Sequence, residues 1–485
     1  MIALVLAATF TRPLERVTTM DPAFSQTVYD ARSVKLVYET PLEVDYYARP
    51  YRLTAGACEL PEVSGDGLVY RFKMRSKEAT AEDMVRSLER LRDPETVSPN
   101  AWMLDAADTI EADGDTVEIR LKKRFHCLPW LMAMAPAAIV KADGSGTGEY
   151  ELAKWRKNHE MVFARKKPVP GGFDTVRYLV VDDVSTQWLM FLKGEVDFLG
   201  EIPRDNWDAA MTAEGKLAPG LAAQGIELHT IPTLETIYVG FNMKDPVVGG
   251  NRALRQALNA AFDFPAWEKY YRGRVLAADG PVPPGVAGKL DAPFGYSFDP
   301  EKAKALLAEA GYPGGIDPKT GRRLVLTLSM GRASQDSRES GELLASFYER
   351  IGVKLELKFL TWDAFVRAVN DGRTQMYRIG WVGDYPDAQN FLQLFHSKNM
   401  PPGPNHSAYS NAEFDREYDL ATEARSEEER NAHWRRCQEI VREDCPWVFA
   451  NFNLASSLVR PRVGNYVASD FPYGQERYLK ARDGR

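Results

Sequence analysis

Between residues 323 and 382, segments in which hydrophobic positions recur with the period of a strand take turns with segments that have the period of a helix. A period of two, typical of a half-buried strand, is carried by Leu324, Leu326, Leu328 and Met330, and again by Val353, Leu355, Leu357 and Phe359. Helical patterns occupy residues 337–350 and 361–370, and a short apolar strand at residues 379–382 completes the run. The order of strand, helix, strand, helix, strand predicts a parallel or mixed sheet with helix cover, which is an α/β fold.

Three further helices are marked by their terminal residues. Asp299 and Pro300 begin one helix and Gly311 ends it, while Thr80 caps a second helix with Asp83 reaching back to it. The expected buried faces are Ala303, Leu306, Leu307 and Ala310; Met84, Leu88 and Leu91; and, in a third helix over residues 251–262, Leu254, Leu258 and Ala261. Residues 280–285, rich in proline and glycine, predict an extended loop.

Composition narrows the classes of partner. A chain of 485 residues with 44 % hydrophobic and 27 % charged positions predicts a globular protein of two or three domains. The net charge is −7 and no basic cluster stands out, so nucleic acid is not expected as a partner. No apolar stretch reaches the roughly 18 to 20 residues of a membrane span. Residues 1–10 have an apolar run without a basic start and predict a first β-strand rather than a signal peptide.

The usual catalytic and metal-binding motifs are not supported. The glycines at residues 144–148 precede a strand-like stretch rather than a helix, so they do not indicate a nucleotide site. The six histidines show no zinc-hydrolase spacing, and no serine-nucleophile elbow occurs. Cys437 and Cys445 could pair across a turn, but buried thiols are the favoured interpretation for all four cysteines. We expect no cofactor and no metal ion.

The stretch YRIGWVGDYPDAQNF, residues 377–391, gathers chemistry at the end of a predicted strand. An acid pair formed by Asp384 and Asp387, a metal site, a ligand anchor and a plain turn are all open interpretations. Ligands in α/β sheets bind beyond the carboxyl ends of strands, where Asp384 lies. Asp387 is explained by the turn itself. As a ligand anchor, the other polar and aromatic residues would suit a zwitterion. Asp384 would bind its cation, Arg378 would bind its carboxylate, and Trp381 would pack on its apolar atoms.

Taken together, sequence motifs across nearly the whole chain resemble the peptide/nickel class, family 5, of extracellular substrate-binding proteins that serve ABC transporters. The motifs occur in family order: TTMDPA (residues 18–23), VYETPLEVD (37–45), ATAEDMVRSLERLRDPET (79–96), GTGEYELAKW (146–155), FLKGEVDFLGEIP (191–203), YVGFNM with NRALRQALNAAFD (238–263), GPVPPGVAG (280–288), DPEKAKALLAEAGY (299–312), the stretch at 377–391, SAYSNAEFDREYDLA (407–421) and EIVREDCPWVFANF (439–452).

The resemblance assigns roles to residues of the 377–391 stretch. In peptide binders of the family, an aspartate that follows a tryptophan by three residues holds the α-ammonium of the ligand, and these residues match Asp384 and Trp381. An arginine three residues before the tryptophan, here Arg378, meets the ligand carboxylate in some members. The strand from Gly380 to Val382 would pair with the ligand backbone as an added strand.

The resemblance also implies an organisation and a function. It implies a two-lobed periplasmic binding protein fold with a hinged cleft: lobe I over residues 1–38, 142–237 and 455–485, a small inserted domain over 39–141, and lobe II over 238–454. The protein is expected to be a monomer that captures short peptides outside the cytoplasmic membrane, with a leader missing or truncated, and delivers them to a permease without catalysis. The alternatives are a metal chelate or oligosaccharide ligand on the same fold, and a hydrolase using Asp384 and Asp387.

Overall fold

The structure divides the chain into two compact units. It is a computed structural model of the 485-residue chain, and it describes residues 8–291, 296–401, 403–471 and 473–482. Unit 1 comprises residues 1–231 and 455–485, and unit 2 comprises residues 232–454. The chain enters unit 2 within β12 (Glu227–Phe241) and returns within β17 (Trp447–Val459). The finer division predicted for lobe I and its inserted domain stays a prediction.

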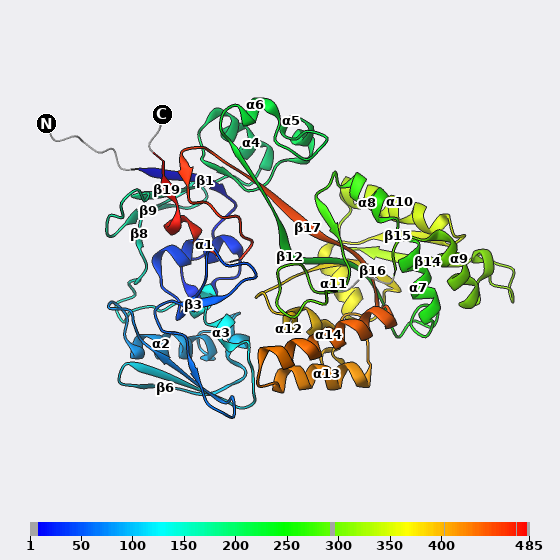
Figure 1. The fold of residues 1–485 in the computed structure, drawn as a ribbon, viewed down its shortest axis with the longest axis horizontal. Coiled ribbons are helices and arrows are strands. Elements are labelled where there is room, and N and C mark those ends of the chain that lie inside the picture. The colour runs from blue at the N-terminus through cyan, green and yellow to red at the C-terminus, as the bar shows by residue number, and fades with distance from the viewer. Residues whose placement is uncertain (1–7, 292–295, 402, 472, 483–485) are drawn as a thin grey trace. The chain divides into compact units, whose positions relative to one another are not determined.

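Unit 1 contains two four-stranded sheets, drawn mainly in blue and cyan in Figure 1. The first has the order β1 (Thr9–Leu14), β10 (Thr175–Val180), β9 (Glu160–Arg165) and β8 (Tyr150–Arg156), in which only the β1–β10 pair is parallel. The second has the order β4 (Glu62–Val63), β5 (Val69–Lys73), β7 (Thr116–Leu121) and β6 (Ala107–Asp113). The first strand predicted over residues 1–10 lies mostly outside the described residues; its last two residues open β1.

Helices and short strands complete unit 1. The helices are α1 (Val28–Val37), α2 (Ala81–Arg92), α3 (Leu128–Leu131), α4 (Val184–Lys193), α5 (Trp207–Ala210) and α6 (Pro219–Ala222). The short strands are β2 (Leu42–Val44) with β3 (Leu53–Ala55), β18 (Val463–Gly464) with β19 (Lys480–Ala481), and β11 (Phe198–Leu199) against the end of β17. The predicted cap of α2 is confirmed, because Thr80 and Asp83 exchange bonds with each other's backbone N–H.

A buried ionic cluster lies inside unit 1. The Lys35 ammonium donates to the Glu43 carboxylate over 2.8 Å, and Arg477 donates to the same carboxylate oxygen over 2.6 Å. At most 10 % of any of these three side chains is exposed. Burial opposes ionisation of Glu43, but Arg477 and Lys35 outweigh it and lower the pKa of Glu43 to about 2. The cluster therefore joins α1, β2 and the C-terminal segment through one carboxylate.

Unit 2 is built on a mixed sheet, as the alternating pattern predicted. Its strand order is β17, β12, β16 (Met376–Val382), β14 (Val325–Met330) and β15 (Lys354–Phe359), and β13 (Val275–Ala277) also pairs with β17. β14 is parallel to both β15 and β16, whereas β12 is antiparallel to β16. The α/β class is therefore confirmed.

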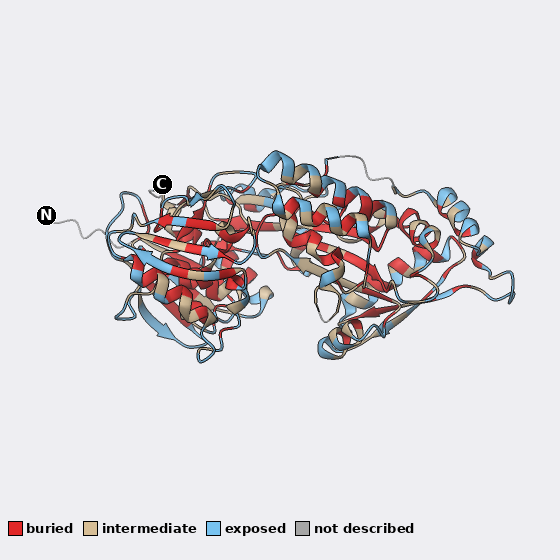
Figure 2. Cartoon of the chain, turned by 90° about the horizontal axis from the view of Figure 1, so that it is seen from below, coloured by how far each residue is buried: buried red, intermediate tan, exposed pale blue. Residues whose placement is uncertain are grey.

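One face of this sheet shares an apolar core with the helices that lie between residues 252 and 349. The helices of unit 2 are α7 (Arg252–Ala260), α8 (Phe264–Tyr270), α9 (Pro300–Glu309), α10 (Gln335–Glu349), α11 (Trp362–Asn370), α12 (Ala388–Leu392), α13 (Ala412–Glu423) and α14 (Glu427–Asp444). The core includes Leu254, Leu258, Ala303, Leu307, Leu328 and Leu344. The predicted cap of α9 is confirmed, because the Asp299 carboxylate accepts from the Lys302 backbone N–H. Figure 2 shows that the helices carry buried residues on one side and exposed residues on the other.

The opposite sheet face carries aromatic and hydroxyl side chains. Tyr238 and Trp447 stack with ring centroids 3.4 Å apart. The Ser407 hydroxyl accepts from the Trp447 indole over 3.0 Å and lies 2.8 Å from the Tyr377 hydroxyl. These contacts tie β12, β17 and the first part of β16 together.

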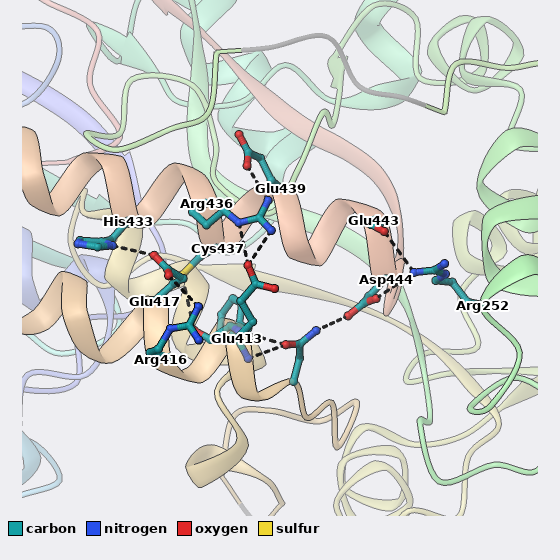
Figure 3. A network of polar contacts seen from close by, with 12 residues as sticks. Arg252, Glu413, Arg416, Glu417, His433, Arg436, Cys437, Glu439, Glu443 and Asp444 are labelled. Atoms are coloured by element: carbon teal, nitrogen blue, oxygen red, sulfur yellow. Dashed lines mark hydrogen bonds and ion pairs between the residues drawn. The ribbon is translucent and has the colours of Figure 1, made fainter.

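Polar pairs join α13 to α14 and also link residues within α14, and the two helices run side by side (Figure 3). Arg436 bridges Glu413 at 2.7 Å and Glu439 at 3.0 Å, and the His433 ring lies 2.7 Å from the Glu417 carboxylate. Arg436 and its partners are each more than 40 % exposed, so these pairs add little stability. The buried aromatic residues between the helices are the stronger contribution.

All four cysteines, namely Cys58, Cys127, Cys437 and Cys445, are free and buried, as predicted. The predicted loop over residues 280–285 has neither helix nor strand. Among the described residues, the helices lack the length and apolar character that crossing a bilayer requires.

Candidate functional site

The last part of β16 has an open edge. β16 pairs with β12 along its whole length, from Met376 to Val382. On the other side, β14 ends early: its last residue, Met330, pairs with Arg378. Residues 379–382 therefore have no neighbouring strand on that side among the described residues. Because backbone groups of an antiparallel strand point alternately to its two edges, this segment can accept one more extended chain.

Side chains of the last part of β16 alternate between the two faces of the sheet. Alternation along β16 places Arg378, Gly380 and Val382 on one face and Ile379 and Trp381 on the other. A Cβ atom at Gly380 would come within 2.7 Å of the Ile237 Cδ1 atom, so only glycine fits without displacing that side chain. Val382 is 60 % exposed and offers an apolar surface at the strand end.

Asn390 connects the two residues that the sequence singled out. Its side-chain oxygen accepts from the Trp381 indole N–H over 3.0 Å and from the Asp384 backbone N–H over 3.2 Å. Its side-chain amide donates to the Asp384 carboxylate over 3.1 Å. Asn390 is 1 % exposed and belongs to α12, so a rigid helix fixes both the indole and the carboxylate.

Asp384 is an exposed carboxylate with reduced hydration. Its Oδ2 atom accepts from Asn390, and no cation among the described residues pairs with it. The surrounding protein raises the pKa of the Asp384 carboxyl above its ordinary value, and the Asn390 hydrogen bond opposes this rise. A positive group placed at the other carboxylate oxygen would relieve the cost of keeping the charge.

Arg378 lies on the opposite face from Trp381 and is held by its own unit. Its two terminal nitrogens donate to the Ser340 and Tyr271 hydroxyls, each over 2.9 Å. The guanidinium lies 5.1 Å from the Trp267 ring centroid. No carboxylate of the described chain neutralises it. The structure therefore joins Trp381 to Asp384 but does not join Arg378 to either.

Asp387 has a structural role in the same turn. It is 6 % exposed and its carboxylate accepts from the Gln389 backbone N–H over 2.9 Å, which caps α12. A capping carboxylate of this kind is already committed to a helix terminus. The geometry of Asp387 therefore does not support the interpretation of Asp384 and Asp387 as a catalytic acid pair.

Asn390 and the holders of Arg378 were not identified from the sequence. Asn390 follows Asp384 by six residues, and its role depends on α12 folding back onto the strand end. Ser340 and Tyr271 are 38 and 107 residues from Arg378 in sequence. An Asp-Ala-Gln-Asn start, which places an asparagine in the first helical turn, is the one local signal for Asn390.

Comparison with known proteins decides the family. The model of the family described as "Bacterial extracellular solute-binding proteins, family 5 Middle" matches residues 52–401, which include β16 and the Asp384 turn. The chain belongs to this family. The resemblance stated from the sequence motifs is therefore confirmed.

Relatives of the family 5 protein match most of its length. It is 27 % identical over 464 residues to heme-binding protein A of Haemophilus influenzae, covering 85 % of this chain and 81 % of that protein. It is 25 % identical over 509 residues to the dipeptide-binding protein of Escherichia coli K12, and this match covers 94 % of this chain and 90 % of that protein. A glutathione-binding protein of Escherichia coli O1:K1 is 27 % identical, and this match covers 89 % of this chain and 86 % of that protein.

Solved structures show the same fold. The periplasmic murein tripeptide binding protein in its unliganded open form matches with a TM-score of 0.84 at 22 % identity, covering 99 % of this chain and 98 % of that chain. The periplasmic binding protein DppA from Helicobacter pylori, solved with a peptide, matches with a TM-score of 0.75 at 20 % identity, covering 98 % of both chains. The predicted periplasmic binding protein fold is confirmed.

Proposed function

We propose that this family 5 protein is the substrate-binding component of an ABC importer and that it captures short peptides. The observation that carries the proposal is the Asp384 turn at the end of an open strand edge. A peptide needs a site for its ammonium group, a site for its backbone and tolerance for its side chains. The end of β16 offers the first two within one rigid element.

The ammonium group of the peptide would bind Asp384. Asn390 holds one carboxylate oxygen and leaves the other for a cation. The raised pKa of Asp384 means that its charge lacks stabilisation in the free protein, so a cation gains more there than at an ordinary surface carboxylate. The Trp381 indole, fixed by the same asparagine, supplies an apolar wall beside the ligand.

The peptide backbone would add a strand to residues 379–382. Such pairing recognises main-chain groups that every peptide has, so affinity does not depend on one sequence. Arg378, which has hydroxyl partners but no carboxylate partner, would attract the carboxylate end of the ligand electrostatically. The dipeptide- and glutathione-binding names of two relatives support a peptide-like ligand.

Partners and location follow from the same proposal. The protein would act as a monomer outside the cytoplasmic membrane and hand its ligand to a permease. It would carry out no chemistry on the peptide, since Asp387 caps α12 rather than facing a substrate. Family membership and the periplasmic relatives support this location.

The experiment compares a tripeptide with its ester analogue. Freshly purified protein is first analysed by native mass spectrometry, which reports any ligand carried through purification. Calorimetric titration then compares the tripeptide with the same molecule carrying an ester in place of one backbone amide. Loss of a strand hydrogen bond should weaken binding by about 0.5 to 1.5 kcal/mol. Equal affinities at every ester position would reject backbone pairing, and cleavage of the tripeptide would reject the non-enzymatic role.

A further inference from the structure

Unit 2 contains a pocket of about 390 Å³ that belongs to no part of the Asp384 turn. It is lined by the ends of β14 and β15, by α11 and by the segment that leads into β16. Ala364 and Ala368, one helical turn apart on α11, face it with methyl groups only, and this explains the space between helix and sheet.

Three cations line this pocket. Lys358 and Arg367 are exposed, and their side chains make no ion pair or hydrogen bond within the described chain. Arg373 has one partner, Asp371, over 2.5 Å, in a pair that is more than half exposed on both sides. The residues that line the pocket include no aspartate or glutamate. The local charge is therefore positive and largely uncompensated.

Two largely buried residues with hydroxyl side chains line the same pocket. Ser329 is 3 % exposed and Thr374 is 5 % exposed, and within the described residues neither hydroxyl has a hydrogen-bond partner. The oxygen atoms of both hydroxyls are nevertheless accessible from the pocket, so each can donate to a ligand bound there. Water could bond both hydroxyls, but only an anion would also neutralise the charges of Lys358 and Arg367.

The position of Ser329 follows from the strand pattern. Leu326, Leu328 and Met330 of β14 point into the apolar core, so Ser329 points to the other face. Ser329 pairs with Lys358 in the parallel register, which brings the lysine to the same face. The pocket is thus built from the polar positions of two adjacent strands.

We propose that this pocket binds a phosphate group. Phosphate oxygens accept hydrogen bonds from hydroxyl groups and from arginine and lysine side chains, which are the groups found here. A doubly charged anion also matches the excess of positive charge in the pocket. A pocket of about 440 Å³ in unit 1, lined by Asp21 and Arg90 among others, lacks this property, because those two residues already pair at 2.6 Å.

The phosphate site is separate from the proposed peptide site. Ser329 pairs with Tyr377 of β16, the residue before Arg378, and alternation along the strand turns Ser329 and Tyr377 to the opposite face of the sheet from Arg378. Asp384, which would hold the ammonium of the peptide, prefers a cation, whereas the pocket prefers an anion. Failure of one proposal therefore leaves the other intact.

The test titrates inorganic phosphate into the full-length protein at constant ionic strength set by chloride. One saturable site is expected. Arg367→Gln and Lys358→Gln should each weaken binding by about tenfold or more, because each removes a charged donor. Asp371→Asn should tighten binding, because it releases Arg373. The matched control is Lys354→Gln on the same strand, whose ammonium bonds Glu356 and lies outside the pocket.

A second arm identifies the source of the phosphate group. Phosphatidylcholine vesicles with and without phosphatidic acid are mixed with the protein and sedimented. Co-sedimentation that needs phosphatidic acid and Arg367 indicates a lipid headgroup, whereas phosphate binding without co-sedimentation indicates a soluble phosphate compound. The proposal is overturned if phosphate shows no saturable binding, or if Lys354→Gln weakens it as much as Arg367→Gln does.

Discussion

Asn390 donates its side-chain amide to the carboxylate of Asp384 over 3.1 Å. The same asparagine accepts from the backbone N–H of Asp384, so it fixes the direction of the carboxylate, and its amide favours the charged form. Since the asparagine is buried in α12, the carboxylate is presented by a rigid element rather than by a free loop. Preorganisation of this kind reduces the entropy lost when a ligand binds.

Asp384→Ala should abolish measurable peptide binding. Removing one partner of an ion pair that the ligand covers typically costs about 2 to 5 kcal/mol, which is roughly thirty- to several-thousand-fold in affinity. The melting temperature of the free protein should hardly change, because Asp384 is exposed. N-acetylation of the peptide removes the ammonium, so it should weaken binding to wild type and have little further effect on Asp384→Ala. Calorimetric titration of both peptides into both proteins measures this coupling.

Asp387→Ala is the matched control for that cycle. It removes the cap of α12 and should lower the stability of the protein by about 0.5 to 2 kcal/mol. Its peptide affinity should stay close to that of wild type. If acetylation and the Asp384 substitution have simply additive effects, Asp384 does not hold the ammonium.

Peptide affinity should fall as the pH is lowered through the pKa of Asp384. Surrounding protein raises this pKa in the free protein, and a bound ammonium would lower it in the complex. Affinity is therefore full above the raised pKa and is lost as the pH falls through it, by up to about tenfold per pH unit. Titrations below about pH 7 keep the peptide amine protonated. The pH dependence should disappear in Asp384→Asn; an unchanged profile in that variant would assign it to another group.

Arg378→Gln should discriminate between peptides with a free and an amidated carboxyl end. The guanidinium has hydroxyl partners only, so its charge is available to a ligand carboxylate. The variant should therefore lose more affinity for the free acid than for the amide. Ser340→Ala removes one holder of the guanidinium and keeps its charge, so it should reduce that preference less. Equal losses for both peptides, accompanied by a lower melting temperature, would show that Arg378 is purely structural.

Glu43→Gln should destabilise unit 1 strongly. The substitution leaves Lys35 and Arg477 buried without their shared carboxylate, which typically costs about 3 to 5 kcal/mol. Glu118→Gln is the control, because Glu118 pairs with Arg71 at the surface and should cost less than about 1 kcal/mol. Urea unfolding measures both. Since the folded pKa of Glu43 is depressed to about 2, its stabilising effect is present above its ordinary pKa and is lost as the pH falls toward 2.

Local signals in the sequence predicted the elements well. Thr80 with Asp83, and Asp299 with Pro300, mark helix starts because a cap is satisfied by neighbours within three residues. Strand periods in β14 and β15 were equally clear, because one face of each strand is apolar. The class of fold and the place of Asp384 at a strand end follow from these signals alone.

Contacts between distant segments could not be predicted in the same way. The carboxylate of Glu43 meets Arg477, which is 434 residues away, and no local pattern announces that pair. The early end of β14 relative to β16 is likewise a matter of register between strands, and this register creates the open edge. Arg378 illustrates the point further: the sequence shows its charge, but only the fold shows that the distant Ser340 and Tyr271 hold it.

The four buried thiols allow the opening of each unit to be followed, because each unit contains two of them. Cys58 and Cys127 lie in unit 1, and Cys437 and Cys445 lie in unit 2. Burial raises the pKa of Cys58 and of Cys445 to about 12, so the reactive thiolate is scarce while the chain stays folded. Alkylating reagents can then modify these positions only after local opening. Mass spectrometry of the modified cysteines would time the opening of each unit separately, without any engineered probe.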